Sequence, residues 1–254
     1  MVLPFLASGG GLVKWENGVR HCPIPFSDIL VYMKSRLKIL LRLVHRCNDL
    51  LFDLRRGVRT FRSAAPPGGR DASHFRAYDC SRTRPLRRAL KRLDLGAEGF
   101  HFVDLGCGKG KAMLMALEAG YRACFGVDLS PALCRQAVRN LSRRLAPEDW
   151  WRFHVDEADV RRWQLPPGDK LLYLYNPFDE VILREVIRGI EQAAAHRPKD
   201  RMMVLYMNPL RAALLDRHPG FERLFGHHDF DHNRSVAAWR WVPSGFTRPG
   251  APSG

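Results

Sequence analysis

An acid followed by three alternating glycines is the stretch of this chain whose residue types and spacing point most directly to chemistry. Asp104 ends an apolar run, and Gly106, Gly108 and Gly110 then occupy every second position. Glycines permit positive φ and let a ligand approach the backbone closely, and the helix expected from Lys111 presents free N–H groups at its start. This run therefore predicts a cradle for a nucleotide-type ligand.

The spacing inside the turn excludes two common phosphate cradles. The dinucleotide fingerprint needs a third glycine three residues after the second, where this chain has Lys111. A P-loop needs a glycine five residues before its Gly-Lys pair and a Ser or Thr after it, and those positions hold Leu105 and Ala112. The turn is therefore not built for a pyrophosphate or a triphosphate. An acid at the strand end suits a cationic ligand instead.

A second acid, Asp128, follows the next apolar run. A carboxylate at a strand end can accept both hydroxyl hydrogens of a ribose, as it does in dinucleotide-binding folds. The alternative is that Asp128 only helps to begin the following helix, for which Ser130 and Pro131 supply an N-cap and a first-turn proline. NAD enzymes place an acid similarly, so the glycine spacing is what separates the two interpretations.

These acids must be positioned by an alternation of strands and helices. Strands are expected at 100–103, 123–127, 152–155, 171–175, 202–207, 221–225 and 235–242, the last two as an antiparallel pair. Helical runs lie between the first five, the order of a parallel sheet with right-handed crossovers. In such sheets ligands bind beyond the carboxyl ends of the strands, near the switch in strand order. Asp104 and Asp128 both stand at such ends.

The turn resembles the first motif of class I S-adenosylmethionine (SAM) dependent methyltransferases, where it packs against the methionine end of SAM. The chain also resembles one bacterial group of these enzymes, through Asp104 to Gly110, the acid-Leu-Ser-Pro segment at 128–131, the strand ending YNPF at 175–178 and a short element at 52–60. The resemblance covers about residues 52–242. It implies a Rossmann-like α/β fold with a seven-stranded, mostly parallel sheet, and SAM as cofactor.

The resemblance also implies roles for the acids at the strand ends. Asp104 would help to anchor the methionine part of SAM through its amine side, and Asp128 would hold the ribose. The family typically has an acid after the third strand that accepts from the adenine amino group. Asp159 aligns with it, Asp156 is the competing residue, and a solvated acidic turn is the alternative for both.

The end of the fourth strand is where the family faces the methyl group. Several amine methyltransferases hold a target NH₂ there with an Asn or Asp, a proline and an aromatic residue, a pattern that Asn176 and Phe178 resemble. The alternative is a simple helix entry with Asp179 as its cap. The resemblance implies methyl transfer from SAM to an unidentified acceptor, such as an amine of a protein or a small molecule.

The net charge indicates which classes of partner the chain could have. Its 254 residues carry 41 Lys and Arg against 26 Asp and Glu, a formal net charge of +15. This excess favours nucleic acid, an anionic membrane surface or an acidic partner, and it equally fits a chain with Arg on every solvated face.

Six scattered cysteines without zinc spacing predict a reduced, cytoplasmic protein. The polar loop 226–233 has no second cluster to complete a metal site, so no metal is expected.

A basic amphipathic helix, or two, is expected from Phe26 to Leu54. Its apolar residues recur at helical spacing, while Lys34, Lys38 and Arg42 share the other side. Such a helix can pack on its own domain, contact a partner or lie on an anionic membrane. No run is apolar and long enough for a signal peptide or a membrane span, so any membrane contact is expected to be peripheral, through residues 26–54.

Composition divides the chain into three parts. Residues 1–70 are expected to form a basic helical extension and a linker, residues 71–243 the methyltransferase domain, and residues 244–254 a disordered tail. An aromatic and basic surface around Trp150 and Trp151 could serve nucleic acid, although such residues near a sheet edge more often pack. The alternative function is therefore a non-catalytic SAM-fold module that binds nucleic acid or an anionic membrane through its basic surface.

Overall fold

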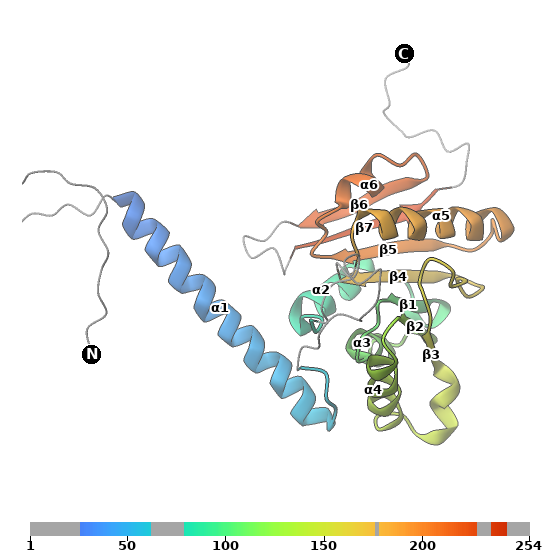
Figure 1. Cartoon of the computed structure of the whole chain (residues 1–254), viewed down its shortest axis with the longest axis horizontal. Helices are drawn as coiled ribbons and strands as arrows, with labels where there is room; N and C mark the ends of the chain where they lie inside the picture. Colours follow the sequence, from blue (N-terminus) through green and yellow to red (C-terminus); the bar gives the residue numbers. More distant parts are fainter. Residues whose placement is uncertain (1–25, 62–78, 176–177, 228–234, 243–254) are drawn as a thin grey trace, which may run out of the picture. The chain divides into compact units, whose positions relative to one another are not determined.

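The computed structural model describes residues 26–61, 79–175, 178–227 and 235–242 (Figure 1). Contacts divide the chain into two units, residues 1–40 and 41–254. The division falls inside helix α1 (Phe26–Arg56). The physical reason is that the second half of α1 buries Phe52 and carries Asp49, which pairs with Lys111 of the other described segment.

Seven strands form one sheet in the order β3-β2-β1-β4-β5-β7-β6. The strands are β1 (His101–Leu105), β2 (Ala123–Asp128), β3 (Phe153–Glu157), β4 (Lys170–Tyr175), β5 (Met202–Met207), β6 (Phe221–His227) and β7 (Val236–Trp241). The first five are parallel, and β7 runs antiparallel to both β5 and β6. The expected seven-stranded, mostly parallel sheet with an antiparallel final pair is confirmed. The strand order switches direction between β1 and β4, which is where open α/β sheets bind ligands.

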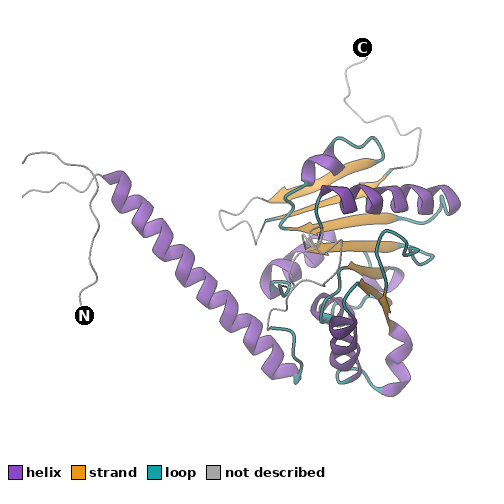
Figure 2. Ribbon diagram, viewed as in Figure 1, coloured by secondary structure: helices purple, strands orange, loops and turns teal. Residues whose placement is uncertain are grey.

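Helices cover both faces of the sheet (Figure 2). One apolar layer lies between the sheet and α2 (Thr83–Leu93), α3 (Lys111–Glu118) and α4 (Pro131–Ser142). The other lies between the sheet and α5 (Glu180–His196) and α6 (Ala212–Asp216). Strand β4 is buried along almost its whole length because both of its faces are covered. Short 3₁₀ turns at Ala97–Gly99 and Pro147–Arg152 complete the connections.

Local signals begin two of these helices where the sequence predicts. The Ser130 hydroxyl accepts a hydrogen bond from the Leu133 N–H at 3.4 Å, with Pro131 in the first turn of α4. The Asp179 carboxylate accepts from the Ile182 N–H at 3.1 Å and caps α5. Each cap begins its helix directly after the carboxyl end of a strand. The caps therefore help to fix the backbone at the edge of the sheet where the acids stand.

Helix α1 is long but basic. Within the described residues, no helix combines the length and the apolar composition that a membrane crossing requires. The half of α1 that belongs to the larger unit buries His45, Asp49, Phe52 and Asp53. That half is therefore part of the same compact body as the sheet.

Candidate functional site

The glycine turn leaves the carboxyl end of β1 with three residues in positive-φ backbone. Gly106, Gly108 and Gly110 have φ values of 86°, 53° and 75°, which side chains of L residues rarely adopt. The N–H groups of Gly106 and Cys107 both donate to the Val127 carbonyl, at 2.9 and 3.0 Å. The turn is therefore held against the end of β2, and Gly110 is the N-cap of α3.

A further glycine, Gly126 in β2, lets the turn and α3 approach the sheet. A β-carbon built at Gly126 would lie 2.6 Å from the Met113 sulfur and 2.8 Å from the Cys107 β-carbon. Both distances are below van der Waals contact, so only glycine fits without movement of the turn. No pattern in the sequence marks Gly126, because the need for glycine at this position comes from residues of the neighbouring helix and turn.

Gly126→Ala is expected to destabilise the protein by about 1 to 3 kcal/mol, because an added methyl group overpacks the contact between β2 and α3. Urea unfolding followed by circular dichroism measures the change. Gly189→Ala in α5 is the control, since a β-carbon there meets nothing within 4 Å. The control should leave stability unchanged or raise it slightly. Equal effects of the two substitutions would contradict the packing argument.

Asp104 is buried where β1 meets the glycine turn, with 3% of the residue exposed. Burial raises the pKa of its carboxyl group well above the usual range, and the nearby charge of Asp128 raises it further. Among the described residues, no cation lowers this pKa in compensation. A buried carboxyl group without a counter-charge is costly to keep. The position is therefore suited to a positively charged group of a ligand.

Asp128 lies at the end of β2, two residues beyond Gly126, which pairs with Asp104 of β1. Its two carboxylate oxygens accept from the backbone N–H groups of Gly108 and Ser130, both at 2.9 Å. Burial raises the pKa of this carboxyl group, and these hydrogen bonds oppose the rise. The carboxylate is thus fixed against the glycine turn. Each oxygen keeps a lone pair for a further donor, such as a ribose hydroxyl.

The loop after β3 places the backbone next to Asp159 against the end of β2. The Ala158 N–H donates to the Asp128 carbonyl at 3.1 Å, which places residue 159 at the same edge of the sheet. The Asp159 carboxylate accepts from Arg161 Nε at 2.9 Å, and this hydrogen bond lowers its pKa. Asp156 instead accepts from Trp163 Nε1 at 2.7 Å and contacts His154. Both candidates for the adenine contact therefore already have partners.

Of the two residues predicted to face the methyl acceptor, only Phe178 lies within the described residues. Asn176 lies outside the described residues. Phe178 is buried, with 5% of the residue exposed, in the apolar layer under α5. Leu105 at the end of β1 and Leu174 of β4 belong to the same layer. The structure thus places Phe178 in the core next to the strand ends, and its contact with a substrate stays a prediction.

Comparison with known proteins agrees with this geometry. Residues 102–195 match a family model described as a methyltransferase domain. This part of the chain is a class I methyltransferase domain. None of the curated proteins matches the chain in sequence. The family implies the use of SAM.

Solved structures of methyltransferases are similar to this chain at low identity. The Escherichia coli protein yhhF, assigned as a methyltransferase, is 14% identical over 63% of this chain and 88% of its own, with a TM-score of 0.50. A TehB-like SAM-dependent methyltransferase from Corynebacterium glutamicum is 16% identical over 62% of this chain and 88% of its own, with a TM-score of 0.45. At such identity the likeness concerns the fold alone.

The segment before α2 contributes residues to the methyltransferase domain that the sequence analysis missed. The Tyr173 hydroxyl donates to the Ser81 hydroxyl at 2.9 Å, and Tyr175, the last residue of β4, lies beside Arg82. Burial raises the pKa of both tyrosines. Residues 79–83 therefore cover the carboxyl end of β4. No sequence pattern signals this, because the contacts join residues about 90 positions apart.

The element at 52–60 is tied to the glycine turn. The Asp53 carboxylate accepts from the Thr60 N–H at 2.6 Å and from the Phe61 N–H at 2.8 Å, which closes the loop after α1. The Asn140 amide of α4 accepts from the Arg59 N–H at 3.0 Å and donates to the Lys109 carbonyl at 2.9 Å. Asn140 therefore links this loop to the turn that holds the cofactor in the family.

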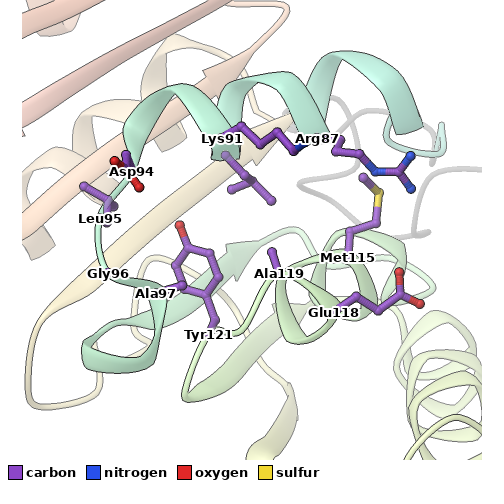
Figure 3. A pocket seen from close by; sticks show the side chains of 11 residues that line it. Arg87, Lys91, Asp94, Leu95, Gly96, Ala97, Met115, Glu118, Ala119 and Tyr121 are labelled. Atoms are coloured by element: carbon purple, nitrogen blue, oxygen red, sulfur yellow. The ribbon is translucent and has the colours of Figure 1, made fainter.

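A separate cavity of about 490 Å³ lies between α2 and the end of α3 (Figure 3). Figure 3 shows Arg87 and Lys91 of α2 on one side, and Glu118 and Tyr121 on the other. Helix α3 begins at the glycine turn and ends at Glu118, so this cavity lies at the opposite end of the helix from the turn. It is therefore distinct from the edge where Asp104 and Asp128 stand.

The polar loop considered for a metal, 226–233, lies outside the described residues from position 228 onward. In the part of the chain that the structure describes, no three side chains of His, Cys, Asp or Glu converge as metal ligands would. The described cysteines 47, 80, 107, 124 and 134 are all free thiols.

Proposed function

We propose that the chain transfers a methyl group from SAM to an amine acceptor. The observation that carries the cofactor part is the buried carboxyl group of Asp104, which no described cation compensates and which lies beside the glycine turn. The amino group of the methionine part of SAM would supply the missing positive charge. The turn fits a ligand without a pyrophosphate, because its spacing is not that of a phosphate cradle.

Each acid at the strand ends has a part in this proposal. Asp104 would hold the amine side of the methionine, the backbone at Gly106 to Gly110 would admit it closely, and Asp128 would accept from the ribose hydroxyls. Asp159 would reach the adenine amino group by sharing or exchanging its hydrogen bond with Arg161. SAM, when bound, supplies a methyl group activated on a sulfonium.

The chain's own contribution to rate would be positioning. A methyl group passes in line from its donor to a nucleophile, so fixing the donor and excluding water supply most of the acceleration. A neutral amine attacks with its lone pair and loses its proton afterwards, so a general base is not required. The segment Tyr175 to Phe178 supports the amine assignment, because amine methyltransferases carry a similar pattern at the end of the same strand.

Isothermal titration with S-adenosylhomocysteine, the demethylated product, tests the cofactor part. The wild type should bind, and Asp128→Ala should weaken binding by about tenfold or more, because a hydrogen bond to a charged group contributes about 1.5 to 3 kcal/mol. Asp216→Asn is the control, since Asp216 accepts from Trp239 and Arg223 and not from the glycine turn. Absence of binding in the wild type would refute the proposal.

Transfer of labelled methyl from SAM into a fractionated lysate tests the acceptor part. The proposal expects label that survives mild base, because N-methyl groups resist hydrolysis whereas methyl esters do not. Label lost in base, or label found only on hydroxyl groups, would contradict an amine acceptor. Binding of S-adenosylhomocysteine without transfer to any fraction would instead support the non-catalytic binding module.

A further inference from the structure

The second half of α1 exposes an apolar stripe to solvent. We call the residues of this stripe the α1 outer face: Leu43, Val44, Cys47, Leu50, Leu51 and Leu54. All six are exposed, Leu43 by 54% and Leu54 by 67%. They recur three, four and seven positions apart, so they lie along one side of the helix. Monomeric proteins rarely leave a continuous stripe of this kind in water unless it has a partner.

The opposite side of the same helix is fixed to the methyltransferase domain. Asp49 pairs with Lys111 at 2.7 Å, and both side chains are 1% exposed. Phe52 is buried in the core layer under α2 and α3. Arg56 pairs with Glu118 at 2.6 Å. These contacts prevent the helix from rotating to bury its outer face, so this face remains available to another surface.

The exposed charged residues of α1 beside the outer face are positive, and the Glu118 carboxylate of α3 is paired with Arg56. Arg46 and Arg55 are exposed beside it, whereas Asp49 and Asp53 are buried and hydrogen-bonded. The stretch from Leu43 to Arg56 therefore presents leucines and cations to solvent and no carboxylate. The net charge of +15 has the same sign. An apolar stripe flanked by cations matches a lipid surface with anionic headgroups.

Two exposed indoles lie in the turn that follows α4, and the end of α4 contacts the residue after α1. The Arg143 guanidinium donates to the Gly57 carbonyl at 3.2 Å, which places the end of α4 against the residue that follows α1. From there, Trp150 donates to the Leu145 carbonyl at 3.3 Å, and Trp151 is 65% exposed. Tryptophan favours the interface between headgroups and acyl chains. These indoles are a separate apolar group from the α1 outer face, with Glu148 and Asp149 directly before them in the chain.

We propose that the α1 outer face docks the protein on an anionic lipid surface. Pairing with a second copy is disfavoured, because two such helices would bring Arg46 and Arg55 together with no exposed carboxylate between them. Binding of RNA would neutralise the arginines but leave the leucines in water. The proposal does not depend on methyl transfer, since it concerns a face of the helix on which none of the cofactor residues stands.

Flotation with lipid vesicles tests the proposal on the full chain. The protein should float with vesicles of 70% phosphatidylcholine and 30% phosphatidylglycerol, and not with phosphatidylcholine alone. Leu50→Glu with Leu54→Glu should weaken this binding by about tenfold or more, because it removes apolar contact and adds repulsion. Val181→Glu with Leu210→Glu is the control, since both residues are exposed on other elements. Circular dichroism spectra and urea unfolding should be unchanged in all of them, which shows that the variants are folded.

Unchanged flotation of the Leu50→Glu, Leu54→Glu variant would overturn the proposal, and so would an equal loss in the control pair. A polarity-sensitive dye on Cys47 then identifies what covers the face. Cys47 is exposed, the other described thiols are buried, and Cys22→Ser removes the one cysteine outside the described residues. A blue shift with anionic vesicles supports the proposal. A shift that depends on protein concentration alone, or on added RNA alone, overturns it in favour of a second copy or of nucleic acid.

Discussion

Asp104→Asn is expected to stabilise the ligand-free protein and, at the same time, to weaken cofactor binding. The carboxyl group is buried, and no described cation compensates its charge. The neutral amide of asparagine has almost the same shape and avoids the cost of a buried charge. Leaving a buried polar or charged group unpaired costs about 1 to 3 kcal/mol, so a gain of this order is expected at pH 8.

The gain should shrink as the pH falls. Burial raises the folded-state pKa of Asp104 above its value in the unfolded chain. Between these two values the folded state binds the proton and the unfolded state does not, so wild-type stability rises as the pH falls. Asparagine lacks this dependence. The difference between variant and wild type is therefore largest above the folded pKa and disappears near the ordinary pKa of aspartate.

Urea unfolding of both proteins at several pH values measures this difference, and titration with S-adenosylhomocysteine measures the binding cost. We expect binding to weaken by about tenfold or more at pH 8, because the variant cannot pair with the amino group of the ligand. In the wild type, binding should also release a proton, since a cation beside Asp104 lowers its pKa. A stability loss in Asp104→Asn at every pH would show that the carboxylate has a partner in the ligand-free protein.

The part of the site that could be predicted from sequence is the part built from local signals. Asp104 and Asp128 each follow an apolar run, and the parallel pairing of β1 with β2 brings the two strand ends together. The glycine spacing predicts a turn that a ligand can approach, and Ser130 with Pro131 predicts the start of α4. These features depend on neighbours within a few residues, so the sequence displays them directly.

The remaining contacts join segments that are distant in the sequence, and no sequence pattern shows that these segments meet. The need for glycine at position 126 comes from Met113 and Cys107, which lie on a different element. The helical pattern of 26–54 does not show which half of the helix belongs to the unit that contains the sheet. Buried polar pairs such as Asp49 with Lys111 leave no periodic trace. Their partners lie far apart in the sequence and meet only when the chain folds.

The ion pair between Asp49 and Lys111 is expected to carry a large share of the stability that joins α1 to the glycine turn. Asp49 Oδ1 lies 2.7 Å from Lys111 Nζ, and it also accepts from the Thr83 hydroxyl at 2.8 Å. Its second oxygen accepts from Arg82 at 3.1 Å. Burial alone would raise the pKa of Asp49, but Lys111 and Thr83 outweigh it and hold the pKa below its usual value.

The two partners should not be equivalent when they are removed singly. Asp49→Asn leaves the Lys111 ammonium buried without a described counter-charge, which costs about 3 to 5 kcal/mol in other buried pairs. Lys111→Met leaves Asp49 with Arg82 and Thr83, so the loss should be nearer to about 1.5 to 3 kcal/mol, the value of one hydrogen bond between charged groups. Because the folded pKa of Asp49 is lowered, the wild-type advantage over Asp49→Asn should also disappear as the pH falls through that pKa.

Combining the substitutions provides the decisive comparison. Lys111→Met destabilises the wild type, yet it should stabilise the Asp49→Asn variant, because it removes the ammonium that has lost its partner. Urea unfolding of the four proteins measures this change of sign. Arg184→Met at the exposed pair with Glu180 is the control, with an expected effect of about 0.5 kcal/mol or less. If Lys111→Met destabilises both backgrounds equally, the two residues are not coupled, and α1 is held by its other contacts, such as Phe52 in the core and Arg56 with Glu118.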